Sequence, residues 1–140
     1  MEITDADAYA LHQPMDRTVG DQRLEMTDVY WIVVEIDTDE GHTGTGWMKS
    51  LGFAPETMLH LTESQFLDPL IGVDPFATEE IKADLRSRSV YYGELGLSAW
   101  PRGAIDVALW DIKAQASGQP LFRLLGGSET ELPAYVSSMD

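Results

Sequence analysis

The stretch RGAIDVALWDIKAQASGQPLFRLLGG, residues 102–127, decides the fold of this chain. Its apolar residues recur at the spacing of one helix face, and with the segment just before it they form a stripe: Ala99, Ile105, Ala108, Leu109, Ile112 and Ala116. Ser98 is placed to cap this helix, and Pro101 fits its first turn. Gly118 ends the helix and Pro120 prevents its continuation. The pattern predicts a long helix with one buried face, a short second apolar turn and a double-glycine ending.

The N-terminal third has the character of β-strands. Residues 29–36, VYWIVVEI, are β-branched and aromatic, and HTGTGWM continues as a strand after the polar turn DTDEG, which predicts a hairpin. The opening ITDADAYAL alternates in period two and suits a third antiparallel strand, although its alanines also suit a helix. As a strand it would carry alanines on one side and the following residues on the other: Ile3, Asp5, Asp7, Tyr9 and Leu11.

Two further segments of this region are expected to be irregular. Residues 12–28, HQPMDRTVGDQRLEMTD, are polar with one proline and one glycine, and we interpret them as a long loop. The glycines of GHTGTG, residues 41–46, lack the spacing of a dinucleotide or phosphate loop, and no helix follows them directly. They predict that two backbones pack closely at this strand.

From residue 54 onwards the hydrophobic period is helical. The segment APETMLHLTESQFLDPL places three apolar residues near one helix face: Met58, Leu61 and Phe66. A second helix is expected to start with Asp74 as its N-cap and Pro75 at its first position. A strand meander followed by helices on one face is an α+β arrangement. The sequence therefore predicts an α+β fold, a three-stranded antiparallel meander followed by a helical bundle.

Composition limits the classes of protein that this chain can represent. With 140 residues, 44% of them hydrophobic, it can build one core. A net charge of −15, from 24 acidic and 9 basic residues, argues against a nucleic-acid partner and favours a salt-rich source. No cysteine is present, which excludes disulfides and thiolate chemistry. Because neither a spanning segment nor a signal peptide is recognisable, we expect no membrane partner and a cytoplasmic location.

The residues by themselves do not assemble a catalytic site. Asp106 and Asp111 lie on one predicted helix, but five residues place them about 140° apart around its axis. His12, His42 and His60 have no partners at a metal-ligand spacing. The run DTDEGHTG, residues 37–44, resembles the start of a calcium loop, yet a hairpin turn explains it better.

The segment AIDVALWDIKAQASGQPLFRLLGG resembles the signature that ends the capping domain in the mandelate racemase and muconate lactonizing enzyme group of the enolase superfamily. Its recurring parts are an alanine-rich helix with ALWD, then Gly-x-Pro-Leu, then LLGG. EIDTDEGHTGTGW is similar to the second and third strands of that domain, and LIGVDP to the segment before its next helix. The resemblance implies a capping domain over residues 1–127, with a linker and the start of the first barrel strand over residues 128–140.

This resemblance also implies a partner domain. In the family a TIM barrel of about 200 further residues follows and carries the magnesium ligands and the proton-transfer groups. That catalytic barrel is missing from these 140 residues, so the chain is expected to be incomplete and inactive alone and to hold no ligand for magnesium. Family members abstract the proton α to a carboxylate, act on small carboxylates such as acid sugars or hydroxy acids, and are usually homo-oligomers.

The capping domain contributes the lid that closes over the barrel, and its two lid loops match residues 13–27 and 47–54. By resemblance, Arg17 and Lys49 pair with a substrate carboxylate or hydroxyl, while Met15, Trp47 and Phe53 form an apolar wall. Apolar residues in such a loop can equally pack on their own domain. The loop looks most like that of an acid-sugar dehydratase; a racemase or cycloisomerase is the alternative. A stand-alone, self-associating module without catalysis is the alternative from another class.

Overall fold

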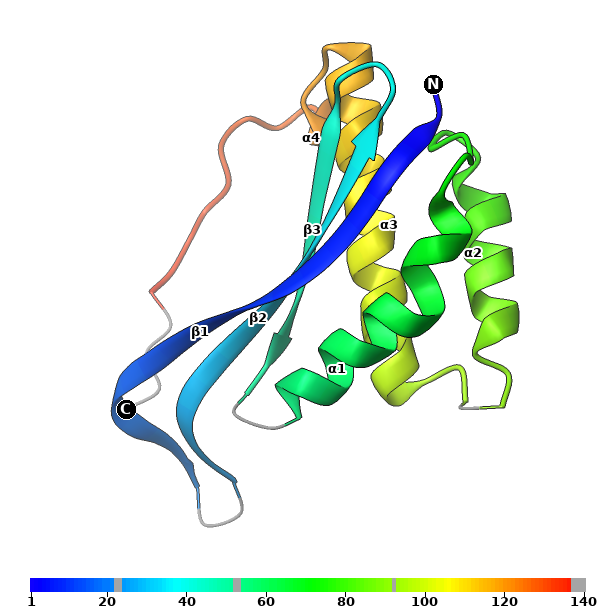
Figure 1. The fold of residues 1–140 in the computed structure, drawn as a ribbon. Coiled ribbons are helices and arrows are strands. Elements are labelled where there is room, and N and C mark those ends of the chain that lie inside the picture. Colours follow the sequence, from blue (N-terminus) through cyan, green and yellow to red (C-terminus); the bar gives the residue numbers. More distant parts are fainter. Residues whose placement is uncertain (22–23, 52–53, 92, 137–140) are drawn as a thin grey trace.

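A three-stranded sheet with helices on one of its faces forms the molecule, seen here in a computed structural model that describes residues 1–21, 24–51, 54–91 and 93–136 (Figure 1). The strands β1 (Ile3–Asp21), β2 (Leu24–Thr38) and β3 (Thr43–Ser50) are antiparallel and neighbour each other in chain order. The helices are α1 (Pro55–Thr62), α2 (Thr78–Arg88), α3 (Ala99–Ser117) and the short α4 (Leu121–Leu124). The predicted α+β meander with a helical bundle is confirmed.

β3 lies directly on α3, and glycine makes this approach possible. Gly44 and Gly46 point at the helix, and a Cβ atom built on Gly46 would lie 1.9 Å from the carbonyl oxygen of Ala104. A Cβ on Gly44 would lie 2.1 Å from the carbonyl oxygen of Ala108. Since Cβ atoms cannot approach an oxygen so closely, only glycine fits at either position. The predicted packing role of the GHTGTG glycines is confirmed at these two positions.

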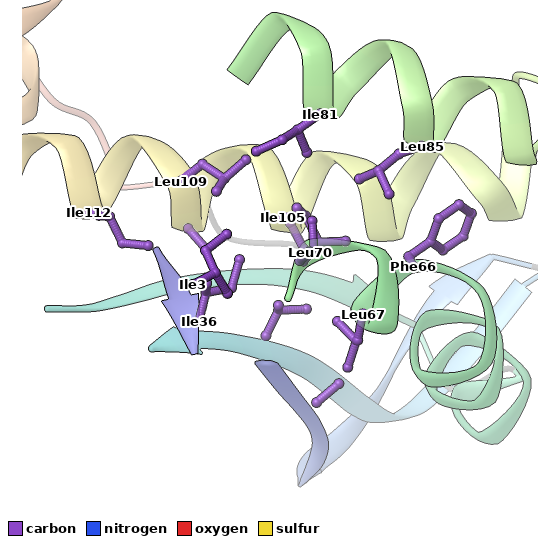
Figure 2. Packing of buried hydrophobic residues seen from close by; sticks show 14 residues of the cluster. Ile3, Ile36, Phe66, Leu67, Leu70, Ile81, Leu85, Ile105, Leu109 and Ile112 are labelled. Atoms are coloured by element: carbon purple, nitrogen blue, oxygen red, sulfur yellow. The ribbon is translucent and has the colours of Figure 1, made fainter. Parts of the chain in front are cut away.

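α3 is the centre of the core, between the sheet and α2 (Figure 2). Its buried residues Ile105, Leu109 and Ile112 face Ile3 and Ile36 of the sheet. Further large members come from α2 and from the short π-helix (Glu63–Leu67) and 3₁₀-helix (Asp68–Leu70) that follow α1: Phe66, Leu67, Leu70, Ile81 and Leu85. Burying apolar side chains on two sides of one helix is the main stabilising contribution here. Of the predicted stripe, Ala116 is exposed.

β1 begins with a bulge that changes which residues face the core. Ile3 pairs with Thr38 and Asp5 with Asp37, so Thr4 is an extra residue in β1. The bulge turns Ile3 to the helix-covered face, where it is 1% exposed beside buried Ala8. The expectation that Ile3 shares a face with Asp5 and the other odd positions was therefore wrong.

The expected loop over residues 12–28 was also wrong, because β1 and β2 continue there as a two-stranded ribbon. His12 pairs with Tyr30 and stacks on its ring at 4.7 Å between centroids. Farther out, Val19 pairs with Met26, and both side chains are buried. This polar segment has no strand periodicity of its own, and cross-strand contacts hold it in an extended conformation.

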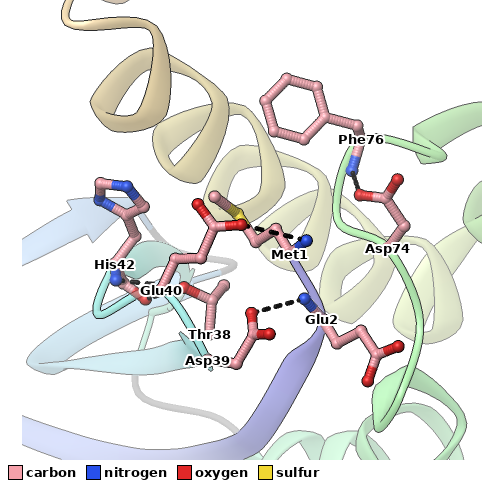
Figure 3. Close-up of polar contacts among 8 residues, drawn as sticks. All are labelled: Met1, Glu2, Thr38, Asp39, Glu40, His42, Asp74 and Phe76. Carbon is pink, nitrogen blue, oxygen red and sulfur yellow. Dashed lines mark hydrogen bonds and ion pairs between the residues drawn. The ribbon is translucent and has the colours of Figure 1, made fainter.

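Two helix starts differ from the prediction. α2 begins at Thr78, because the carboxylate of Asp74 accepts a hydrogen bond from the backbone N–H of Phe76 and closes a turn before the helix (Figure 3). Ser98 has helical backbone angles and donates its hydroxyl hydrogen to the carbonyl of Gly93, so it does not cap α3. The predicted end of α3 is confirmed by Gly118, which adopts φ 62°.

The amino terminus is held against the β2–β3 turn. The α-ammonium group of Met1 lies 3.2 Å from Oε1 of Glu40, and the backbone N–H of Glu2 donates to Oδ1 of Asp39 at 2.7 Å (Figure 3). The hydrogen bond to Glu40 raises the pKa of the terminal amine above 8.0. These contacts fix the first residue of β1 at the end of the sheet.

The segment after α4 is irregular. Residues 128–136 form no helix or strand, and the assignment of 128–140 to a linker and a barrel strand stays a prediction. Positions 137–140 lie outside the described residues.

Within the described part of the chain, no helix combines the length and the apolar character needed to cross a bilayer.

Gly46→Ala tests the strand-helix contact. The added methyl group has no space against the carbonyl of Ala104, so we expect the free energy of unfolding to fall by at least about 2 kcal/mol. Gly103→Ala on α3 is the matched control, because nothing lies within 4 Å of its Cβ position, and it should raise stability by about 0.5–1 kcal/mol. Urea unfolding measures both, and equal stability of the two variants would contradict the contact.

Candidate functional site

The face of the sheet that α1, α2 and α3 do not cover carries the candidate site (Figure 1). β3 alternates strictly, with Gly44, Gly46 and Met48 buried and Trp47 and Lys49 exposed. Trp47 and Lys49 therefore belong to a strand, and the expected loop over residues 47–54 was wrong as far as Ser50. The strand continues because every second residue packs against the helices.

Trp31 of β2 is the centre of a cluster on this open face. Its ring meets that of Trp47 edge to face, with centroids 4.8 Å apart and an interplanar angle of 75°. Its indole N–H donates to Oε1 of Gln13 on β1 at 3.1 Å. The Nζ atom of Lys49 lies 5.5 Å from the centroid of the same ring. All three strands thus meet at one indole ring, and Trp47 remains 55% exposed beside it.

A hollow of about 360 Å³ adjoins this cluster where the ribbon leaves the sheet. A second irregularity in β1 forms it, because Pro14 pairs with Asp28 and Val19 with Met26, which leaves three extra residues in β1. Its lining comes from β1 alone: Gln13, Pro14, Met15, Asp16, Arg17 and Val19. Gln13 lines the hollow and also accepts the hydrogen bond of Trp31, so it joins the hollow to the aromatic cluster.

The structure places four of the five predicted site residues. Met15 and Arg17 line the hollow, and Trp47 and Lys49 belong to the cluster. Phe53 lies outside the described residues.

The sequence prediction missed Trp31 and Gln13. The cross-strand register identifies both residues. Trp31 pairs with Lys49 of β3 and with Leu11 of β1, and Gln13 is its diagonal neighbour, two residues after Leu11.

The same face changes character toward the other end of the strands. Asp5 pairs with Asp37, and Asp7 pairs with Glu35, so four carboxylates lie in two directly opposed pairs. Glu35 accepts a hydrogen bond from the hydroxyl of Tyr9 at 3.0 Å, which raises the pKa of Tyr9 above 10.0. Opposed like charges destabilise a sheet and are screened by salt. The opposed carboxylates disfavour an anionic ligand at this end of the face. The salt-rich source stays a prediction.

The acidic residues of α3 have structural contacts. Asp111 accepts a hydrogen bond from the backbone N–H of Thr45 at 3.0 Å and covers the free edge of β3, while Asp106 lies 3.1 Å from Nζ of Lys82. Within residues 1–21, 24–51, 54–91 and 93–136, no three His, Asp or Glu side chains form a group that could hold a metal ion.

Comparison with known proteins identifies the family. Residues 4–126 match the family described as mandelate racemase / muconate lactonizing enzyme, N-terminal domain. The chain belongs to this family. A D-galactonate dehydratase family member from Marinomonas sp. (strain MWYL1) is 39% identical over 102 residues, 71% of this chain and 24% of that protein. The L-talarate/galactarate dehydratase of Salmonella typhimurium (strain LT2) is 30% identical over 113 residues, 81% of this chain and 28% of that enzyme.

Solved structures agree with this N-terminal-domain assignment. The crystal structure of the Salmonella typhimurium L-talarate/galactarate dehydratase with Mg and L-lyxarohydroxamate has a TM-score of 0.83 at 28% identity, covering 89% of this chain and 33% of that one. A racemase from Streptomyces coelicolor with bound magnesium has a TM-score of 0.86 at 26% identity, covering 91% and 36%. The chain spans 24% to 38% of the length of the curated relatives it matches.

One buried lysine of this mandelate racemase-type domain lies away from the open sheet face. Lys113 on α3 is 9% exposed, and its Nζ donates to Oγ1 of Thr78 at 2.9 Å. The ammonium group lies 4.7 Å from the ring centroid of Trp110 and 5.6 Å from that of Phe76. Burial, and secondly the charge of Lys82, lower the pKa of Lys113 below 10.5. This enclosure makes Lys113 a structural contact between α3 and the start of α2.

Lys113→Met tests that burial. Because the folded-state pKa is below 10.5, the unfolded chain binds the proton more strongly, and the free energy of unfolding rises as the pH climbs from the lowered value toward 10.5. The variant should lose this rise. Urea unfolding of both proteins at a series of alkaline pH values measures it, and the other titrating groups cancel in the difference. Parallel curves would show that Lys113 titrates normally.

Proposed function

We propose that this chain is the substrate-capping part, the lid, of an acid-sugar dehydratase of the mandelate racemase and muconate lactonizing enzyme family. The single observation that carries the proposal is the meeting of Gln13, Trp31, Trp47 and Lys49 beside a hollow lined by Met15 and Arg17. Two basic residues, an amide and indole rings suit a carboxylate with a polyhydroxy chain. Several relatives support the class: three are dehydratases of arabinonate, of L-talarate and galactarate, and of D-mannonate, and another is a D-galactonate dehydratase family member.

In this proposal each residue has a defined task at the mouth of the catalytic domain. Lys49 and Arg17 attract the carboxylate, because opposite charges interact strongly once a closing lid excludes water. Trp47 and Met15 present apolar surface to the carbon chain, and Gln13 fixes the plane of Trp31 through its hydrogen bond. The lid thereby selects and encloses the substrate, whereas proton transfer is left to residues outside this chain.

Exposed apolar surface supports a larger assembly. Tyr91 is 97% exposed, Leu95 is 86% exposed and Leu125 is 61% exposed, on the segment before α3 and at the end of α4. Residues 128–136 add Leu132, Tyr135 and Val136, each at least 80% exposed. Large exposed apolar side chains of this kind are available for contacts with another domain or chain. They support residues 1–127 as a capping domain, the following residues as the lead into a barrel, and association of several copies in the full enzyme.

A cycloisomerase or racemase is the second candidate. The 3,6-anhydro-alpha-L-galactonate cycloisomerase of Streptomyces coelicolor is 27% identical over all 140 residues of this chain. Both candidate reactions begin with the same class of carboxylate, so the lid residues serve either. The fate of the substrate depends on the catalytic domain.

Galactarate binding tests the proposed lid site. We expect millimolar galactarate to shift the indole N–H signals of Trp31 and Trp47 in NMR spectra of the chain. Lys49→Met should weaken this binding about three-fold, as expected for the loss of a partly exposed ion pair. Lys82→Met on α2 is the matched control and should bind like the parent. Equal effects of the two variants, or no shift at all, would contradict the site.

Magnesium provides a second test. Because the described residues offer no three-ligand group, the chain should show no stoichiometric magnesium isotherm and no turnover of acid sugars. Calorimetry with magnesium chloride in high salt, together with a dehydration assay on galactarate and galactonate, measures both. A one-to-one isotherm would overturn the assignment of the metal to another domain, even if galactarate binding to the lid succeeds.

A further inference from the structure

A second hollow is lined by residues of α2 and of the segment Pro69–Val73. α2 lies on the opposite side of the molecule from the ribbon of β1 and β2 (Figure 1). The hollow has a volume of about 240 Å³, and it opens between the segment Pro69–Val73 and one face of α2. The apolar core forms its floor, through Leu70, Ile81 and Leu85, which are 1%, 4% and 2% exposed (Figure 2). The volume is below the roughly 300–1,000 Å³ of sites for small molecules, so a single side chain fits it better than a free metabolite.

The rim of this α2 pocket is acidic. Glu80 and Asp84 both line it, because residues four apart lie on the same helix face. Asp84 is engaged by Arg88, whose Nε lies 2.8 Å from its carboxylate. Among the residues that the structure describes, none forms an ion pair or hydrogen bond with Glu80. One carboxylate therefore stands uncompensated at the edge of an apolar floor.

We propose that the α2 pocket docks a lysine side chain presented by a partner protein. The four methylene groups of a lysine can lie along Pro69 and Val73, the half-buried apolar residues of the lining, above the buried floor. Its ammonium group then reaches the carboxylate of Glu80. A single unpaired carboxylate suits a point charge better than the two-pronged contact that arginine prefers. The net charge of −15 favours a basic partner over an acidic one during encounter.

This inference does not depend on the proposed lid function. The pocket shares no residue with the Gln13, Trp31, Trp47 and Lys49 cluster or with the hollow of the ribbon. If galactarate does not bind, the proposal for the α2 pocket is unaffected. If the α2 pocket does not bind lysine, the lid proposal is unaffected.

Titration of the chain with the peptide acetyl-Gly-Lys-Gly-amide tests the proposal by NMR. We expect the methyl signals of Leu70, Ile81 and Leu85 to shift, and the norleucine counterpart, which keeps most of the stem and lacks the charge, to bind about three-fold more weakly. Glu80→Gln should weaken binding of the lysine peptide by the same factor. The control is Glu79→Gln, since Glu79 has the same charge on the same helix, pairs with Lys82 and does not line the pocket.

Several outcomes would overturn the proposal. Equal binding of the norleucine and lysine peptides would make the pocket merely apolar. If Glu79→Gln and Glu80→Gln weaken binding of the lysine peptide equally, the affinity comes from the overall negative charge of the chain and not from the pocket. Binding of n-butylammonium without binding of the peptide would mean that the pocket takes free amines and not a partner's side chain. Absence of any shift would exclude lysine docking altogether.

Discussion

The contact of β3 with α3 is the constraint on which the rest of this molecule depends. Gly44 and Gly46 bring the strand backbone against the carbonyl groups of Ala104 and Ala108, so the backbones of strand and helix approach each other directly at these two positions. Larger residues occupy the positions where the layers separate, such as Ile36 and Ile105. Small residues set the distance and large residues fill the space beside them, as dense packing requires.

Fixing this distance also decides which way the sheet faces. Because Gly44 and Gly46 must face α3 and Met48 packs with Met58 of α1, Trp47 and Lys49 must point to the opposite face of the sheet. Pairing with β2 then places Trp31 opposite Lys49, and pairing with β1 brings Gln13 within a hydrogen bond of the same indole. The candidate lid surface and the packing surface are thus the two faces of one sheet, and the alternation of side chains along the strands produces both.

Acidic side chains serve structure in some places and leave uncompensated charge in others. Asp111 covers the edge of β3, and Glu40 holds the amino terminus, so these carboxylates replace hydrogen bonds that water would otherwise make. Asp7 and Glu35 oppose each other across two strands, and Glu80 at the α2 pocket has no ion-pair partner within the described part of the chain. Regions with uncompensated charge depend most on salt or on a partner.

The sequence by itself determined the α+β order, the helix that ends at Gly118, the role of the glycines at β3 and the family, because each of these is a local pattern or a contiguous motif. Local patterns follow from the period of a helix or a strand. Only the tertiary structure decided the bulge that turns Ile3 inward, the ribbon over residues 12–28 and the meeting of Gln13, Trp31 and Lys49. These features depend on the register between strands, and register is set by packing against α3 and not by any residue's nearest neighbours in the chain.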